Sequence, residues 1–206
     1  MARRTHVAPR ATSPKFKIIL SLAVITVLTV IAFWGVKDLG FVNYDDDMFI
    51  LNRPQMQQGL SATGLAWALI SPAFPYQNWI PLTLLTYLVD NEIGGLNPLT
   101  YHVTNLILHL FAALLLFWVL YRMTGDIWPC FVAAAFFAVH PLRVESVAWI
   151  SERKDVLAAV FWMLSMLAYV RYRERPGKGR YLALVVLFLL GLMSKPMLVT
   201  LPFALM

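Results

Sequence analysis

The apolar residues of this chain form long continuous runs that are separated by shorter polar segments. The first run, residues 18–36, is flanked by Lys17 and Lys37 and is long enough to cross about 30 Å of hydrocarbon at about 1.5 Å per residue. Continuous runs of this length predict membrane-spanning helices rather than strands. The other predicted spans cover residues 103–121, 127–147, 156–172, 181–193 and 196–206, the last of them cut short.

The span at 127–147 is the least regular, because its continuous apolar part ends at residue 139. Charge favours a full crossing here, since Lys and Arg prefer cytoplasmic loops. With this crossing, the basic leader 1–17, Arg122 and the basic loop 171–180 all lie in the cytoplasm. We therefore expect an uncleaved first span with a cytoplasmic N-terminus, and outer segments at residues 38–102, 140–155 and 194–195.

The long outer segment, residues 38–102, carries a helical pattern of its own. Residues 60–70 are apolar with helical spacing, and either Ser61 or Thr63 is placed to cap a helix there. We expect helices in this segment to lie along the membrane surface. The Gly, Asn and Pro residues of 91–98 predict a turn just before the next span.

Composition agrees with a membrane protein, since 60% of the 206 residues are hydrophobic and only 14% are charged. The formal net charge of +6 comes from basic residues beside the apolar runs. These residues indicate topology, so we do not expect nucleic-acid binding. The single cysteine, Cys130, excludes a disulfide scaffold. The predicted fold class is therefore an all-α, polytopic transmembrane helical bundle with interfacial helices in its first outer segment.

Three adjacent carboxylates follow the first span, at Asp45, Asp46 and Asp47. Their mutual repulsion raises the proton affinity of at least one of them, and such a carboxylate can act as a general base. An acidic turn or a cation site is the alternative interpretation.

His102, Asn105 and His109 are spaced by three and four residues and share one helix face, which is expected to point toward protein. For Asn105 and His109 we favour hydrogen bonds between helices, whereas His102 lies at the outer mouth, within reach of a substrate. No acidic ligand accompanies the two histidines, and we predict no metal site.

Charged residues gather in the second outer segment, between two predicted spans. Positive groups outside the cytoplasm run against the usual bias, and Arg or Lys at this depth can hold a phosphate. Ion pairs among the same residues are the alternative, and a lysine beside a span can also snorkel to the headgroups. The candidate substrate and phosphate residues are His102, His140, Arg143, Glu145, Glu152, Arg153, Lys154 and Lys195.

A candidate base and several cations are thus predicted on one side of the membrane. This combination suits group transfer from a phosphorylated lipid, in which the base takes a proton and the cations stabilise the departing phosphate.

Several segments also resemble a known family. The resemblance is to bacterial relatives of the transmembrane and tetratricopeptide-repeat O-mannosyltransferases, which are polytopic glycosyltransferases of the GT-C class. It covers the chain from about residue 41 onward and is carried by residues 41–47, 78–83, 95–98, 101–109, 140–155 and 191–196.

The resemblance implies a catalytic acidic pair, matched here by Asp45 and Asp46, a lipid-linked sugar donor and inversion at the sugar. It also implies a longer protein with more spans and outward-facing repeats, of which this chain is expected to be the N-terminal part. We therefore expect a cofactor-independent glycosyltransferase of the cell (inner) membrane. Its expected partners are a polyprenyl-phosphate sugar donor, a protein or glycan acceptor and the lipid bilayer. A non-catalytic scaffold and a transporter are the alternatives.

Overall fold

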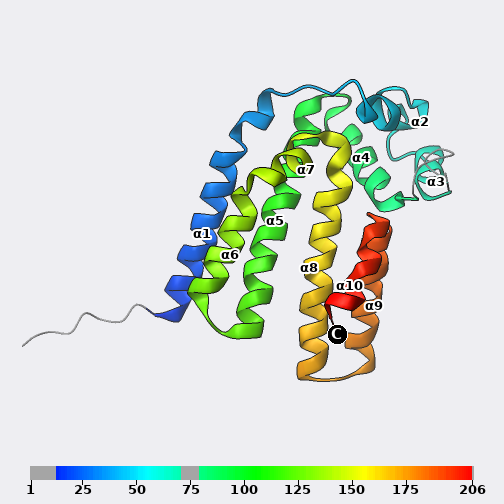
Figure 1. Ribbon diagram of the computed structural model, residues 1–206. Coiled ribbons are helices and arrows are strands. Elements are labelled where there is room, and N and C mark those ends of the chain that lie inside the picture. The colour runs from blue at the N-terminus through cyan, green and yellow to red at the C-terminus, as the bar shows by residue number, and fades with distance from the viewer. Residues whose placement is uncertain (1–12, 71–78, 206) are drawn as a thin grey trace, which may run out of the picture.

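The computed structural model describes residues 13–70 and 79–205 (Figure 1). The leader up to residue 12, Asn78 of one family-like segment and Met206 lie outside the described residues. The elements in chain order are α1 (Pro14–Ala32), η1 (Trp34–Asp38), η2 (Asp47–Leu51), α2 (Pro54–Gln57), α3 (Ala62–Ile70), α4 (Pro81–Gly94), α5 (Pro98–Thr124), α6 (Ile127–Val139), η3 (Pro141–Arg143), α7 (Val144–Ala148), η4 (Ile150–Glu152), α8 (Arg153–Glu174), α9 (Lys178–Leu192), η5 (Pro196–Thr200) and α10 (Leu201–Ala204).

The long helices stand side by side and alternate in direction (Figure 1). α1 packs on α6, α6 on α5, α5 on α8, and α8 on α9. The part of the chain that the structure describes contains helices and no strand. The prediction of an all-α helical membrane bundle is therefore confirmed.

Within the described residues, three segments are long and apolar enough to cross a membrane, namely Pro14–Asp38, Pro98–Thr124 and Ile150–Glu174. The pair Ile127–Val139 and Pro141–Ala148 passes the same test jointly, with a bend of 53° at His140. This bend explains the short apolar run, since Pro141 ends the first helix and the chain continues at a new angle. α9 has 15 residues, which corresponds to about 22 Å at 1.5 Å per residue.

Local sequence signals fix several helix ends. Ser61 begins α3 by accepting a hydrogen bond from Gly64 N at 3.1 Å, so Ser61 rather than Thr63 is the cap. Asn97 caps the start of α5, because its Oδ1 accepts a hydrogen bond from Leu99 N at 3.1 Å. The predicted turn before α5 is present, and Gly95 takes a φ of 60° there.

The segment 38–102 includes a layer of short helices, α2, α3 and α4, which lies beside the upper part of α8 and above the end of α9 (Figure 1). Its core includes Phe49, Leu84 and Leu88. The start of α4 is bonded to the end of α9: Leu82 N donates to Met193 O at 3.1 Å, and the Thr83 hydroxyl donates to Ser194 O at 3.0 Å. This layer is thereby fixed to the end of the bundle.

Candidate functional site

The candidate residues come from four segments that lie at one end of the bundle. These are the loop after α1, the start of α5, the segment from α6 to α8, and the turn after α9, all at the top of Figure 1. The basic loop between α8 and α9 and the start of α1 lie at the opposite end. The fold therefore separates the candidate chemistry from the basic segments that are predicted to be cytoplasmic.

A cleft with a volume of about 340 Å³ lies between α6, α8 and the turn after α9. Its charged lining residues are Arg143, Asp155 and Lys195. The other lining residues are apolar apart from one threonine: Phe137, Ala158, Ala159, Trp162, Met163, Met197, Leu198 and Thr200. Met163 lies eight residues beyond Asp155 on α8, a rise of about 12 Å. The cleft thus combines a charged mouth with a hydrophobic wall that extends along the bundle.

The charged groups of the cleft are held by specific contacts. Lys195 forms an ion pair with Asp155 Oδ1, and the Ser146 hydroxyl donates to Asp155 Oδ2 at 3.3 Å. The Arg143 guanidinium lies 4.3 Å from the centre of the Phe137 ring. Arg143 and Lys195, predicted as phosphate residues from distant parts of the sequence, are therefore brought to one cleft.

Asp46 is fully buried and links the first outer loop to the segment before α8. Its Oδ2 accepts from Val42 N at 2.8 Å, and its Oδ1 accepts from both the backbone N, at 3.0 Å, and the hydroxyl of Ser151. Both carboxylate oxygens are therefore occupied by protein donors. Its neighbour Asp45 is half-buried and makes no hydrogen bond or ion pair with the described residues. Neither aspartate is among the residues that line the cleft.

Arg153 is 0% exposed and lies inside the fold. It forms an ion pair with Asp90, donates to Asn105 Oδ1 at 2.7 Å, and donates to Tyr101 O at 2.8 Å. Its guanidinium also lies 4.6 Å from the centre of the Tyr87 ring. These contacts differ from the phosphate contact expected from the sequence, because the donors of Arg153 are used in joining α4, α5 and α8.

Burial raises the pKa of the Asp90 carboxyl, while the Arg153 guanidinium and the hydroxyl of Thr104 act in the opposite direction. Burial also raises the pKa of Tyr87, whose hydroxyl donates to Ile150 O at 2.8 Å. Both groups therefore serve as uncharged or paired elements of the framework, and neither faces the cleft.

The remaining charged candidates are distributed around the same segment. Lys154 pairs with Glu152 at 2.9 Å, which realises the ion-pair alternative for these two residues. His140 Nδ1 accepts from Leu142 N at 3.2 Å and so caps the turn after α6. Glu145 is exposed, one turn before the end of α7. None of these side chains lines the cleft.

The polar stripe on α5 faces protein, as its spacing predicts, since His102, Asn105 and His109 are all buried. Asn105 Nδ2 donates to Trp149 O at 3.1 Å, and His109 Nε2 lies 2.8 Å from Ala138 O. These are the expected bonds between helices. His102 lies beside the backbone of the loop after α1, at Gly40, and is 1% exposed.

Two groups that organise the site escaped the sequence reasoning. Ser151 holds Asp46, and Asp90 holds Arg153. Asp90 could have been suspected from the sequence, because it is a carboxylate within a largely apolar helix and a buried carboxylate requires a partner. Ser151 carried no signal, since a single serine in a polar segment is unremarkable.

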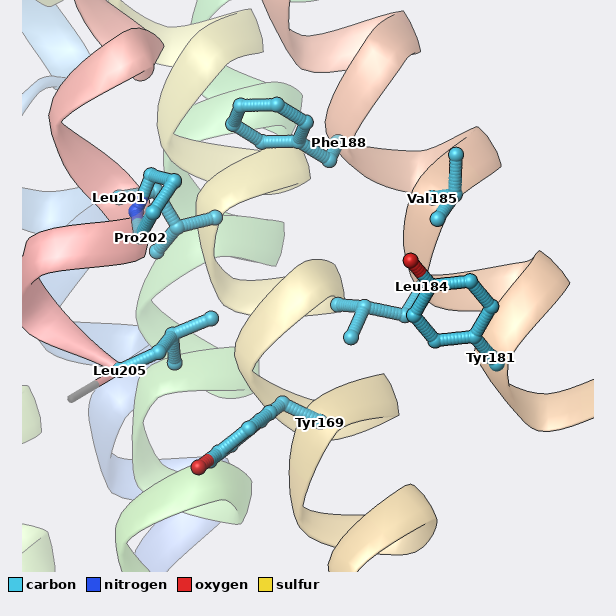
Figure 2. A pocket seen from close by; sticks show the side chains of 8 residues that line it. All are labelled: Tyr169, Tyr181, Leu184, Val185, Phe188, Leu201, Pro202 and Leu205. Atoms are coloured by element: carbon cyan, nitrogen blue, oxygen red, sulfur yellow. The ribbon is translucent and has the colours of Figure 1, made fainter. Parts of the chain in front are cut away.

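The structure contains a further cleft of about 520 Å³ near the other end of the bundle. Figure 2 shows that its lining side chains come from α8, α9 and the α10 region; they are Tyr169, Tyr181, Leu184, Val185, Phe188, Leu201, Pro202 and Leu205. This lining has no ionisable group other than two phenols. Among residues 13–70 and 79–205, no group of three His, Cys, Asp or Glu side chains is arranged to hold a metal ion.

Comparison with known proteins identifies relatives of this chain. Protein O-mannosyl-transferase TMTC1 of Mus musculus is 33% identical over 150 residues, which are 66% of this chain and 15% of that protein. Protein O-mannosyl-transferase TMTC2 of Mus musculus is 36% identical over 109 residues, 53% of this chain and 13% of that protein. Protein O-mannosyl-transferase Tmtc1 of Drosophila melanogaster is 29% identical over 189 residues, 89% of this chain and 22% of that protein.

These similarities relate the chain to the TMTC-type protein O-mannosyl-transferases. The chain spans between 13% and 22% of the length of the three relatives. No family model matches it, and no solved structure does.

Proposed function

We propose, from this relationship and from the cleft, that the chain forms part of a membrane glycosyltransferase. The enzyme would transfer a sugar from a polyprenyl-phosphate carrier to a hydroxyl of an extracytoplasmic protein or glycan, and mannose is the first sugar to test. The observation that carries the proposal is the pair of cations, Arg143 and Lys195, at the mouth of an otherwise largely apolar cleft. A lipid phosphate has this same division between an anionic head and an apolar chain.

In this proposal the donor phosphate lies between Arg143 and Lys195. The guanidinium offers paired N–H donors and the ammonium a compact charge, and both bind phosphate oxygens well. The first isoprene units of the carrier pack along Trp162 and Met163. Both cations stabilise the negative charge that grows on the phosphate when the bond to the sugar breaks.

Asp45 is the proposed general base, because it is half-buried and its carboxylate is not engaged by the described residues. It would take the proton of the acceptor hydroxyl while that oxygen attacks the anomeric carbon of the sugar. The bond from this carbon to the phosphate oxygen breaks, and the carrier phosphate leaves with the bonding electrons. Attack from the face opposite the phosphate inverts the configuration. Asp46 has a positioning role here, through Ser151.

The test is sugar transfer in membranes containing the protein, with a polyprenyl-phosphate mannose as donor and a serine- and threonine-containing peptide as acceptor. Asp45→Asn is expected to lower the transfer rate by about 10²–10⁴-fold, the usual contribution of a general base, without weakening donor binding. Asp126→Asn, at the opposite end of the bundle, is the matched control and should leave the transfer rate unchanged. Transfer at the normal rate by Asp45→Asn would remove the proposed base.

Donor binding separates the enzyme from a scaffold. A polyprenyl-phosphate sugar that occupies the cleft must raise the thermal midpoint of unfolding, because it binds only the folded state. Lys195→Gln should reduce this shift. An unchanged midpoint at saturating donor would favour a scaffold that only presents other domains.

A further inference from the structure

The cleft contains a negative charge as well as two positive ones. Asp155 Oδ1 is paired with Lys195, and Oδ2 accepts from the hydroxyl of Ser146 on α7. The carboxylate is therefore fixed from two sides. The side chains of the pair are only 30% and 28% exposed for Asp155 and Lys195, so bulk water screens their charges incompletely.

Arg143 has no carboxylate partner among the described residues, and its guanidinium lies instead over the Phe137 ring. The remaining lining residues are uncharged. Two positive charges, from Arg143 and Lys195, and one negative charge, from Asp155, give the cleft a net charge of +1. The cleft thus offers one unit of charge to an anionic ligand, although it contains two cations.

We infer that Asp155 is a specificity-determining residue, which shares Lys195 with the donor phosphate and restricts the cleft to lipid carriers with a single negative charge. The inference rests on the proposed function and deepens it. A phosphodiester linking a lipid to a sugar carries one negative charge and neutralises the cleft. A diphosphate linkage carries two, and its second phosphate would meet the Asp155 carboxylate without a free cation to balance it.

The Asp155 carboxylate affects an anionic ligand in two ways: it competes for Lys195, and it repels the ligand directly. Removing the carboxylate releases Lys195 entirely to the ligand and eliminates a repulsion that increases with the charge of the ligand. Replacement of Asp155 by a neutral residue should therefore strengthen binding of both anions and strengthen diphosphate binding more. A residue that only maintained the fold would change both affinities in the same proportion, or weaken them.

The experiment measures binding of two synthetic lipids to the chain in nanodiscs of uncharged lipid. Farnesyl methyl phosphate carries one negative charge, and farnesyl methyl diphosphate carries two. The wild type is expected to bind the monophosphate more tightly. In Asp155→Asn, the diphosphate should gain about tenfold in affinity relative to the monophosphate, as expected when about 1.4 kcal/mol of repulsion between partly screened charges is removed.

Two further variants control for charge and for placement. Asp155→Glu keeps the charge and should keep the preference for the monophosphate, whereas Asp126→Asn removes a carboxylate far from the cleft and should change neither affinity. Ser146→Ala removes the donor to Oδ2 and tests the placement of the carboxylate independently, with a smaller shift toward the diphosphate expected. Thermal unfolding of each variant verifies that it is folded.

The outcomes distinguish this inference from the function on which it rests. If the wild type binds both lipids equally or prefers the diphosphate, the role of Asp155 is refuted while the donor site stands, whatever the variants do. Equal changes for both lipids in Asp155→Asn refute it as well. If the wild type binds neither lipid, the donor site fails and the selectivity falls with it.

Discussion

Arg153 offers the sharpest test of how the outer end of the bundle is held together. Replacement by Met keeps much of the volume of the side chain but removes the charge. The Asp90 carboxylate then remains buried without its cation, and Asn105 Oδ1 and Tyr101 O lose donors at 2.7 and 2.8 Å. Loss of one partner from a buried ion pair costs about 3–5 kcal/mol. We expect Arg153→Met to lose this much in the free energy of unfolding.

The measurement is reversible unfolding in mixed micelles, followed by circular dichroism as a denaturing detergent is titrated. Arg171→Met is the matched control, since Arg171 is exposed near the other end of the same helix. Its free energy of unfolding should stay within about 0.5 kcal/mol of the wild type. Asp90→Asn is the second single variant. It removes the negative charge but keeps an acceptor, because an amide oxygen can still accept from the Thr104 hydroxyl.

The double variant Arg153→Met/Asp90→Asn identifies the cause. With no charge left to bury, it should be more stable than the sum of the single losses predicts by about 1–3 kcal/mol. Additive losses, or a stable Arg153→Met that fails to bind a lipid phosphate, would refute the assignment to the framework and return Arg153 to the phosphate site.

Three other predictions concern a packing contact, a hydrogen bond and the topology of the chain. Gly191→Ala should lose about 1–3 kcal/mol in the free energy of unfolding, because its new methyl group overlaps Leu198, which follows the cleft lysine. Gly179→Ala is the control, since its methyl group enters open space. Equal unfolding curves for the two variants would contradict this packing. Ser151→Ala should lose about 1–3 kcal/mol by removing a hydroxyl donor to Asp46, and an unchanged unfolding curve would show that this bond contributes nothing. In a background without the native cysteine, Gly40→Cys should react with an impermeant maleimide added outside intact cells and Gly179→Cys should not; the reverse pattern would invert the topology.

Features that depend on neighbouring residues were predictable from the sequence. The Ser61 cap, the turn at Gly95 and the buried face of α5 each arise within about two helical turns of chain. Helical periodicity alone identifies a polar stripe such as His102, Asn105 and His109, and the scarcity of charge in the chain implies that the stripe faces protein. The same local patterns located the long helices α1, α5 and α8, whereas residues 196–206, predicted as a sixth span, contain the short elements η5 and α10.

The direction of each charged side chain at the start of α8 was not predictable. Successive residues on a helix point about 100° apart, so Arg153, Lys154 and Asp155 face three different surroundings. Only the packing of α4 and α5 decides that Arg153 is the one that enters the core. Similarly, Asp46 and Ser151 are separated by 105 positions, and no local pattern connects them. The sequence could indicate a charged site here, but not the division of its members between framework and cleft.

The bonds from the start of α4 to the end of α9 have a consequence for biosynthesis. The Thr83 hydroxyl and its acceptor, Ser194 O, are 111 residues apart, so the acceptor is synthesised well after the threonine. Until then the layer of short helices lacks its bonds to the end of α9, and Lys195 cannot pair with Asp155. The lining of the cleft is therefore completed only after residue 195 has been translated, and a ribosome that stalls before that residue leaves a product in which Asp155 lacks its cation.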